Sequence, residues 1–328
     1  MKKTTILRLT GLWLVAICLA SCQTQQSVTT LKLAHGLNTK HPVHLALEYM
    51  GERLNEISGG TMSVDIYPSG QLGSERELIE LLQIGSLAMT KVSSSPLEGF
   101  VPAMKIFSLP YVFRDDAHFW AVLESDIGQE LLQAGQGVRL RGLAYYDAGS
   151  RNFYTVDKPV NTPDDLNGLK IRVQLSPTAM AMVKALGGAP TPISWGELYT
   201  ALQQGVVDGA ENNPPSFVSS KHYEVAKYFT LDEHTRVPDI ILMSDYVWQR
   251  LDTQQQKWLS QAMAESVVYQ RKIWSEATDA ALATAKESGV EIIYPDKTQF
   301  QSRVKAMHDA LQGSELEPLL KRIQKVTP

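Results

Sequence analysis

Two arginines lie at the ends of predicted strands, where a guanidinium group could bind an anion. Arg151 comes just after a predicted strand at 141–146, and Arg172 lies near the end of another at 169–173. Strand ends of an open α/β sheet face the ligand crevice, and the planar fork of an arginine matches the two oxygens of a carboxylate. The two positions therefore favour a site for an organic acid, although the same spacing also fits arginines in surface ion pairs.

Two amides and an indole add uncharged groups to this candidate site. Asn212 and Asn213 follow a predicted strand at 207–211, and two prolines stop its continuation. An amide both donates and accepts hydrogen bonds, which suits an acid that carries hydroxyl groups, while asparagine is also a common turn residue. Trp195 lies in a loop with two further prolines, where its ring could stack on the apolar face of a sugar or fill the core.

The known catalytic signatures do not occur in the sequence. There is no Gly-x-Ser-x-Gly elbow, Walker loop, His-Glu-x-x-His or Gly-x-Gly-x-x-Gly. A Ser-x-x-Lys at 302–305 lies in a predicted amphipathic helix without a partner motif, and no carboxylate pattern completes a metal site around His35, His41 and His44. We therefore expect no metal and no cofactor. A periplasmic enzyme and a scaffold lipoprotein stay open as alternatives to a binding protein.

The composition is that of an ordinary globular protein. The 328 residues are 44% hydrophobic and 20% charged, with 22 Gly and 16 Pro, which excludes disordered, collagen-like and polytopic membrane chains. After residue 22 no apolar run approaches the ~18 residues that a spanning helix requires. The two cysteines, Cys18 and Cys22, lie near the N-terminus, so the rest of the chain can form neither an internal disulfide nor a cysteine-based zinc site.

The first residues have the layout of a secretory signal, with three cations, an apolar run at 12–20 and small residues. The run ends in Leu-Ala-Ser-Cys22, which resembles the bacterial lipobox. We expect 1–21 to be a lipoprotein signal peptide, 22–30 a tether, and Cys22 the lipid anchor that holds the protein to a bacterial membrane on the periplasmic side. The remaining chain has 28 basic and 35 acidic side chains, a net charge of −7. Such a surface argues against nucleic acid and anionic lipid headgroups as partners.

Hydrophobic periodicity predicts an alternation of strands and helices. Apolar positions recur at helical spacing over 42–57 and alternate as in a strand over 62–67. Parallel sheets with helices on their faces suit such an order, because right-handed crossovers place the helices there. A break near 146–151 separates two α/β lobes, and a long late helix is expected over about 253–288. The other expected strands are 31–34, 87–92, 141–146, 169–173, 207–211, 240–244 and 290–294, and the other helices 75–85, 163–167, 177–186 and 197–204.

Five segments have a specific order and spacing, at 67–77, 109–111, 168–173, 188–192 and 197–212. Together they resemble the DctP family of extracytoplasmic solute receptors for TRAP transporters. The resemblance implies a two-lobed periplasmic binding protein fold with a ligand cleft between the lobes and a long late helix across both. It also implies TRAP membrane permease subunits as partners. On this pattern the first lobe is 31–148 plus about 238–277, and the second lobe is 149–237 plus about 278–328.

The same resemblance implies roles for the candidate site residues. The carboxylate-pairing arginine of the family falls on Arg172 and its second arginine on Arg151. The amide beside the carboxylate falls on Asn212, and the aromatic residue that borders the ligand falls on Trp195. The spacing alone left open whether the two arginines bind an acid or form surface ion pairs, and the resemblance favours the carboxylate site.

The expected ligand is a sugar acid. At two sugar contacts of the sialic-acid-binding members this chain has Ser93 and Gly36, which disfavours sialic acid. Further runs, among them 82–91 and 231–234, resemble the clade that binds hexuronates such as D-glucuronate and D-galacturonate. The side chains that could meet the hydroxyls of such a sugar are Glu75, Glu77, His35, Lys91, Asn212 and Asp239. A C4-dicarboxylate or a small hydroxy or oxo acid would need more positive charge and is the alternative.

Overall fold

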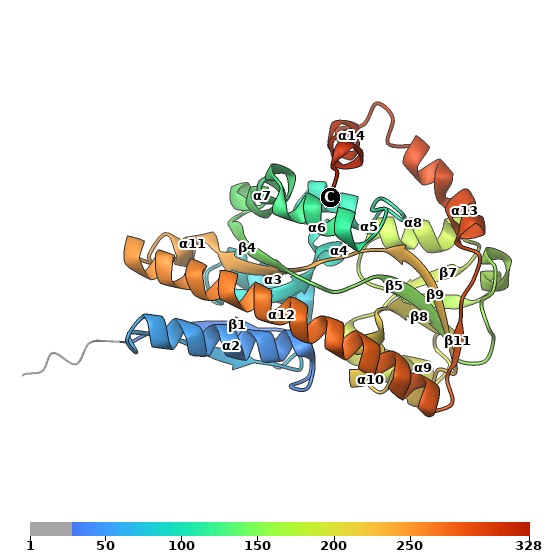
Figure 1. Ribbon diagram of the computed structural model, residues 1–328, viewed down its shortest axis with the longest axis horizontal. Helices are drawn as coiled ribbons and strands as arrows, with labels where there is room; N and C mark the ends of the chain where they lie inside the picture. Colours follow the sequence, from blue (N-terminus) through green and yellow to red (C-terminus); the bar gives the residue numbers. More distant parts are fainter. Residues whose placement is uncertain (1–27) are drawn as a thin grey trace, which may run out of the picture.

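Two separate β-sheets divide the protein into two lobes (Figure 1). The computed structural model describes residues 28–328, so the predicted signal peptide 1–21 and the lipid anchor Cys22 lie outside the described residues. The first sheet has the order β2-β1-β3-β10-β4, with β1 Thr29–Ala34, β2 Met62–Tyr67, β3 Met89–Ser93, β4 Leu140–Tyr146 and β10 Asp239–Ser244. The second has the order β11-β9-β5-β8-β6-β7, with β5 Arg151–Thr155, β6 Lys170–Val173, β7 Ala189–Pro192, β8 Gly209–Asn212, β9 Tyr228–Thr235 and β11 Glu291–Ile293.

Both sheets are mixed, so the prediction of parallel sheets is wrong in part. β10 runs antiparallel to its neighbours β3 and β4, and β5 runs antiparallel to β8 and β9. The reason is that the chain passes between the lobes without a helical crossover, from β4 to β5 at 147–150 and from β9 to β10 at 236–238. The strand that leaves a lobe lies beside the strand that returns, and the two run in opposite directions. The predicted tether is also too long, because β1 already begins at Thr29.

Helices form in the first lobe where apolar residues recur at helical spacing. α2 (Pro42–Ile57) packs on the sheet through Val43, Leu47 and Leu54, each of which contributes about 1.5–3 kcal/mol on burial. The imidazole of His41 caps its first turn by accepting a hydrogen bond from the N–H of Val43 at 3.2 Å. The other helices of this lobe are α3 Glu75–Gln83, α4 Ser94–Leu97, α5 Lys105–Ser108, α6 Asp116–Glu124, α7 Asp126–Gln133 and α11 Asp245–Trp248.

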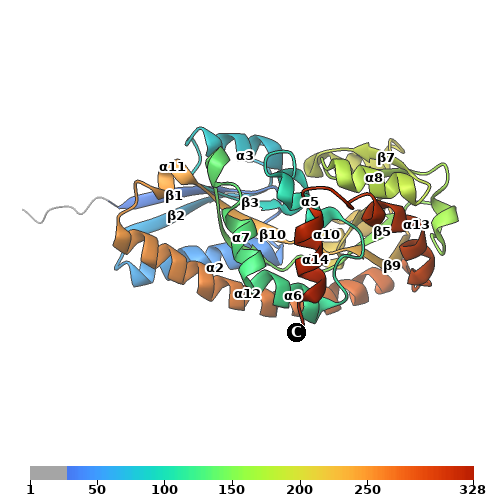
Figure 2. The same ribbon diagram turned by 90° about the horizontal axis from the view of Figure 1, so that it is seen from above.

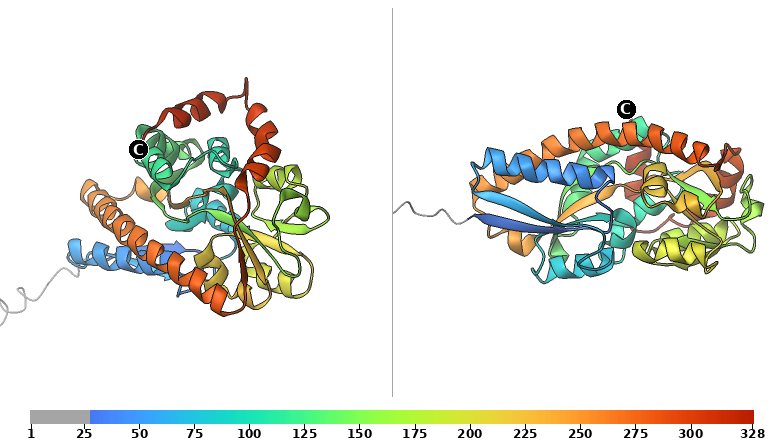
Figure 3. Two further views of the ribbon diagram at one scale, coloured as in Figure 1. Left: turned by 45° about the vertical axis from the view of Figure 1, so that its right-hand side comes forward. Right: turned by 90° about the horizontal axis from the view of Figure 1, so that it is seen from below.

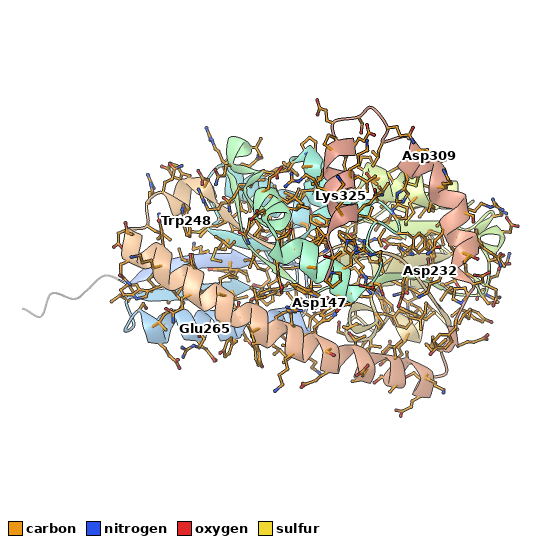
Figure 4. All side chains as sticks on the ribbon, turned by 45° about the horizontal axis from the view of Figure 1, so that its top comes forward. Asp147, Asp232, Trp248, Glu265, Asp309 and Lys325 are labelled. Atoms are coloured by element: carbon orange, nitrogen blue, oxygen red, sulfur yellow. The ribbon has the colours of Figure 1, made fainter. Side chains whose placement is uncertain are left out.

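The helix α12 (Thr253–Glu287) spans both lobes, as the family pattern implies (Figure 1). Its 35 residues extend about 50 Å. Leu259 and Met263 near its start pack with α2 in the first lobe, and Ala285 near its end packs in the second. In its middle, the amide of Gln270 holds the crossing segment at Asp147, whose place beside α12 is marked in Figure 4. No helix within 28–328 is both long and apolar enough to cross a membrane.

Helices also cover both faces of the second sheet. α8 (Pro177–Ala185) and α13 (Lys297–Asp309) pack on one face, and α9 (Leu198–Gln203) and α10 (Pro214–Ser219) pack on the other. Figure 3 shows this lobe from two further directions, with α12 running alongside α2 and on to the second lobe.

The last helix returns to the first lobe. Leu320 and Ile323 of α14 (Glu317–Lys325) are buried in the first-lobe core, with Leu131 of α7 and Phe119 of α6. The expectation that all of 278–328 belongs to the second lobe is therefore wrong for α14. Its two buried apolar residues find their partners across the junction, while β11 and α13 stay with the second lobe.

Candidate functional site

A cleft of about 490 Å³ lies between the lobes and takes its lining from both. α3 of the first lobe and α8 of the second lie on one side of the molecule, and α12 runs along the opposite side (Figure 2). Eight of the nine predicted ligand residues line the cleft: Glu75, Glu77, Lys91, Arg151, Arg172, Trp195, Asn212 and Asp239. We call Arg151, Arg172 and Asn212 the second-lobe wall, and Glu75, Lys91 and Asp239 the first-lobe wall.

Arg172 is a buried cation without a matching carboxylate. It comes from β6, and its side chain is 2% exposed. Its Nε donates to the carbonyl of Ile193 at 2.8 Å, but Nη1 is buried and has no partner among residues 28–328. Burial lowers the pKa of Arg172 below its usual value. An unpaired buried donor on a charged group costs free energy unless a ligand supplies the acceptor, so this group is prepared for an anion.

Arg151, in contrast, is already neutralised by the protein. Its guanidinium pairs with the carboxylate of Glu211, with one Nη2 contact at 2.8 Å, and also donates to the main-chain carbonyl of Glu211 at 2.7 Å. Although burial alone would raise it, Arg151 and His234 lower the pKa of Glu211 to about 2. Arg151 lines the cleft, its charge is balanced within the second lobe, and its role as a second ligand residue stays a prediction.

Arg151 also fixes the direction of Asn212. The Asn212 Oδ1 accepts hydrogen bonds from Arg151 Nη1 at 3.0 Å and from the main-chain N–H of Asn213 at 2.9 Å. With its oxygen satisfied, the amide of Asn212 presents its NH₂ group as a donor. The second-lobe wall thus offers donors to a ligand, from Arg172 and from Asn212.

The pairing of Arg151 continues into the second lobe through a histidine. His234 contacts Asp232 Oδ2 through Nδ1 at 2.7 Å and Glu211 through Nε2 at 3.5 Å. Although burial alone would lower it, these two carboxylates raise the pKa of His234 to about 9. The chain Asp232, His234, Glu211 and Arg151 alternates in charge and balances itself, so Arg172 supplies the excess positive charge of this wall.

The first-lobe wall has the opposite character. Lys91 Nζ lies 2.9 Å from Asp239 Oδ1 and 3.4 Å from Glu75 Oε1, and the two carboxylates raise its pKa against the effect of burial. Ser93 donates to both acids, through Oγ to Asp239 at 3.1 Å and through its N–H to Glu75 at 3.0 Å. Two acids against one lysine leave one negative charge, and Asp239 Oδ2 and Glu75 Oε2 accept no hydrogen bond from residues 28–328.

Two predicted ligand residues make hydrogen bonds within the first lobe, and only one of them, Glu77, lines the cleft. His35 does not line the cleft: its Nδ1 accepts from the N–H of Leu37 at 3.1 Å and its Nε2 contacts His44 at 3.0 Å. Burial lowers the pKa of His35 to about 3, so the ring is neutral and holds the loop. Glu77 lines the mouth of the cleft, but its carboxylate caps α3 by accepting from the N–H and Oγ of Ser74 at 2.7 and 2.8 Å.

Trp195 lines the cleft and contacts the cores of both lobes. It lies on a short turn of 3₁₀ helix and packs, half-buried, against the cores of both lobes. Its ring lies 5.6 Å from the guanidinium of Arg172, within the range of a cation–π contact. Trp195 therefore packs against the core and also lines the cleft, and its stacking on a sugar stays a prediction.

Beyond the cleft, the lobes touch through a buried carboxylate. Glu98 follows α4 in the first lobe, is 2% exposed, and accepts a hydrogen bond at 3.0 Å from the N–H of Thr178 in the first turn of α8. The positive end of the α8 dipole favours the negative charge there. Separation of the lobes would break this contact.

A family model described as bacterial extracellular solute-binding protein, family 7 (DctP), matches residues 33–314. The chain belongs to the DctP family. It is a TRAP solute-binding receptor with the two-lobed periplasmic binding protein fold, in a family of receptors and not of enzymes. Protein YiiZ of Salmonella typhimurium is 40% identical over 299 residues, which cover 90% of this chain and 91% of the relative.

Solved TRAP periplasmic solute-binding proteins are similar to this DctP receptor over most of their length. One from Bradyrhizobium, in complex with α/β-D-galacturonate, is 42% identical with a TM-score of 0.86, over 90% of this chain and 99% of that one. One from Anaerococcus prevotii, with bound α/β-D-glucuronate, is 38% identical with a TM-score of 0.88, over 91% of this chain and 98% of that one.

The residues that balance Arg151 were not among those predicted from the sequence of this DctP receptor. Glu211 lies in β8, every residue of which is buried, and a glutamate inside a buried strand signals a paired cation. Asp232 and His234 lie in β9, a strand that the hydrophobic pattern missed because its last four residues, 232–235, are all polar. The available signal for Glu211 was a glutamate inside the predicted strand 207–211, and for His234 it was the run 231–234, which was noted for its resemblance to the hexuronate clade but was given no role.

Proposed function

We propose that this DctP receptor binds a hexuronate, such as D-glucuronate or D-galacturonate, with the ligand carboxylate on Arg172. The observation that carries the proposal is Arg172 itself: it lines a cleft whose opposite wall has spare carboxylate oxygens, and its buried Nη1 has no partner among residues 28–328. Arg172 and the NH₂ of Asn212 would donate to the carboxylate. Asp239 and Glu75 would accept from sugar hydroxyls. The uronates bound by similar solved proteins support the same ligand class.

The charge of each wall favours a monoanion with hydroxyl groups. A neutral sugar would leave Arg172 as an uncompensated buried cation, which costs several kcal/mol. A dicarboxylate would carry its second charge to Asp239 and Glu75, where like charges repel unless one group is protonated. A hexuronate avoids both penalties, because its only charge meets Arg172 and its hydroxyls meet the acids.

A ligand panel in isothermal titration calorimetry tests the proposal. D-Glucuronate, D-galacturonate, glucose, succinate, malate and sialic acid would be titrated into the protein without residues 1–21. We expect at least one uronate to bind, and glucose and both dicarboxylates to bind at least about 100-fold more weakly, the equivalent of about 2.7 kcal/mol. Binding of succinate or malate without binding of a uronate would overturn the hexuronate assignment. Recovery of the uronate unchanged from the cell separates a receptor from an enzyme.

We further propose that ligand binding closes the lobes, and that the closed form delivers the ligand to the TRAP membrane permease subunits. The ligand groups lie on both walls, so a bound uronate stabilises the arrangement in which the walls approach. Small-angle scattering should show a more compact particle at saturating uronate. Superimposable profiles with and without the uronate would contradict this step.

We also propose that Cys22 carries the lipid that anchors the receptor to a bacterial membrane after removal of 1–21. The lipobox-like Leu-Ala-Ser-Cys22 supports the proposal. Expression in a bacterium fed a radioactive fatty acid should label the wild type, whereas Cys22→Ser should be unlabelled and released in soluble form. Equal labelling of both proteins would contradict the anchor.

A further inference from the structure

Two residues with strained backbones meet at the junction of the lobes. Tyr111, in the loop after α5, has φ 53°, and Glu233 in β9 has φ 49°. A left-handed conformation is rare for residues other than glycine and is an outlier for a bulky aromatic. It persists only where surrounding contacts enforce it, and such outliers concentrate at functional sites. What holds Tyr111 and Glu233 in place is therefore informative.

Tyr111 binds the main chain on both sides of Glu233. Its N–H donates to the carbonyl of His234 at 2.8 Å, and its phenol donates to the carbonyl of Asp232 at 3.1 Å. The preceding carbonyl of Pro110 accepts from His308 of α13 at 2.6 Å. A loop of the first lobe thus closes around one segment of the second lobe, and we call this contact the Tyr111 clip.

The segment under the clip is a bulge. Phe153 of β5 pairs with Thr230, while Arg151, only two residues away, pairs with Thr235, so residues 231–234 bulge out of the ladder opposite Asn152. Bulges beside binding sites redirect side chains. The bulge here is held from the inside as well, since the Asn152 side-chain oxygen accepts from the N–H of Glu233 at 3.0 Å.

The side chains of the bulge lead to the second-lobe wall. Figure 4 marks Asp232 within the second lobe. Its carboxylate accepts from the N–H of Phe153 at 3.1 Å and contacts His234. His234 reaches Glu211, which holds Arg151 and so the amide of Asn212. The position of the second-lobe wall therefore depends on the contacts that hold residues 232–234.

We propose that Tyr111 of the first lobe is a positioning residue for the ligand site. Through its hydrogen bonds to the 231–234 bulge it holds the second-lobe wall in place. The inference rests on the proposed function for its ligand-binding readout alone. Burial raises the pKa of the Tyr111 phenol, so the group stays a donor over the working pH range. A simple packing role would require neither the strained φ of Tyr111 nor its two hydrogen bonds to the carbonyls on either side of Glu233.

Tyr111→Phe removes the phenol hydrogen bond and leaves the ring and the N–H contact. The matched control is Tyr145→Phe, because Tyr145 also donates through its hydroxyl to a main-chain carbonyl, that of Gly128 at 2.8 Å, but away from the cleft. Both variants should lower Tm by a similar amount. In calorimetry with D-galacturonate or D-glucuronate, Tyr111→Phe should bind about fivefold more weakly, the loss expected for one hydrogen bond, and Tyr145→Phe should keep the wild-type Kd.

If the wild type binds neither uronate, the proposed function is wrong, but the role of Tyr111 can still be tested by a measurement without ligand. Two amides report on the bulge, because the N–H of Phe153 donates to Asp232 in the bulge and the N–H of Glu233 in the bulge donates to Asn152. Their hydrogen exchange should be about fivefold faster in Tyr111→Phe and unchanged in Tyr145→Phe. Wild-type exchange in Tyr111→Phe would overturn the proposal. So would a wild-type Kd in Tyr111→Phe at a lowered Tm, because a purely structural role predicts that result.

Discussion

The two walls of the cleft use buried charge in opposite ways. In the first-lobe wall one lysine is outnumbered by two acids, and the spare oxygens of Asp239 and Glu75 are acceptors. In the second-lobe wall the charges of Arg151 are balanced by Glu211, and Arg172 alone remains unpaired. The comparison teaches that the two walls offer opposite charge, which supports the proposed orientation of a ligand with its anionic end at the second lobe and its hydroxyl-bearing end at the first.

The two buried arginines differ in how far the protein itself compensates their charge. Both are buried, on β5 and β6 at either side of β8, but Arg151 is held by several hydrogen bonds whereas Arg172 keeps one donor unused. A buried charge without a partner destabilises a fold, so evolution retains it where function requires it. Among the cleft residues of the described chain, Arg172 is thus the cation whose unmet hydrogen bond the proposed ligand would supply.

Removal of Arg172 should have the largest effect on this comparison. Arg172→Ala should weaken uronate binding by at least about 100-fold, since two charge-assisted hydrogen bonds contribute about 1.5–3 kcal/mol each. Arg172→Lys should lose at least about tenfold, because a point charge does not reproduce the planar fork. Arg141→Ala, which breaks an ion pair with Asp245 outside the cleft, is the control for calorimetry.

The same position should behave differently in a stability measurement. In the absence of ligand, Arg172→Met should not lower Tm, because an apolar side chain of similar volume replaces an uncompensated buried cation. A large drop in Tm would mean that Arg172 holds the fold together, and the contrast with Arg151 would fail.

The free energy of unfolding should depend on pH, because the second-lobe network contains a charged histidine. The pKa of His234 is raised from 6.5 to about 9, so its contribution to stability is complete below pH 6.5 and is lost as the pH rises to about 9. The free energy of unfolding should fall by up to about 3 kcal/mol over that interval. His234→Gln should flatten this alkaline limb in chemical denaturation. A limb of unchanged slope would contradict the charged state of His234.

Neutral buried histidines should produce the opposite limb. Burial lowers the pKa of His35 and of His222 from 6.5 to about 3, so their contribution is complete above pH 6.5 and is lost as the pH falls towards 3. The two limbs together place the maximum of stability near pH 6.5. His222→Gln should reduce the acid limb and leave the alkaline limb intact.

A smaller effect is expected from the first-lobe wall. Asp239→Asn removes a charged acceptor and brings the wall from one negative charge to none, which should weaken galacturonate binding by about tenfold. The same change should improve malate relative to galacturonate, because less repulsion meets the second carboxylate. Asp116→Asn, at a surface ion pair with Arg236, is the control. An unchanged ratio of the two Kd values would remove the electrostatic basis of the comparison.

The smallest effect should come from the contact between the lobes beyond the cleft. Glu98→Gln keeps an acceptor for the N–H of Thr178 but loses the charge that favours the helix terminus, so uronate binding should weaken by about threefold. Glu124→Gln, in an exposed ion pair with Arg271, should have no effect. Equal Kd values for the two variants would mean that Glu98 does not stabilise the closed lobes.

Local sequence patterns predicted the elements well where apolar residues follow a clear period. The strand at 62–67 and the helix at 42–57 have the predicted bounds, because each buries a single continuous face. The strands β5, β7 and β9 were missed, since β7 has two prolines and β9 carries charged residues that are satisfied by distant partners. Periodicity therefore detects burial but does not detect polar residues that are buried in pairs.

The candidate site was predicted by position and only partly by role. Arg172 and Asn212 were identified from strand ends and family motifs, and both line the cleft. The pairing of Arg151 with Glu211 was not predicted, because the two lie 60 residues apart and meet only through the antiparallel pairing of β5 with β8. Which arginine keeps a free donor is thus decided by the sheet, and no local pattern contains that information.

The strand β10 has a consequence for the order in which the lobes form. It lies between β3 and β4, with Ile240 and Leu242 on one face and Ile241 and Met243 on the other. The first-lobe sheet therefore lacks its fourth strand until residue 244 has been synthesised. One face of the core also stays uncovered until α14 has been synthesised. Most of the second sheet, in contrast, comes from one continuous stretch at 151–235. During synthesis the second lobe can therefore gather its core first, and the N-terminal lobe is completed last, against the usual direction of folding along a growing chain.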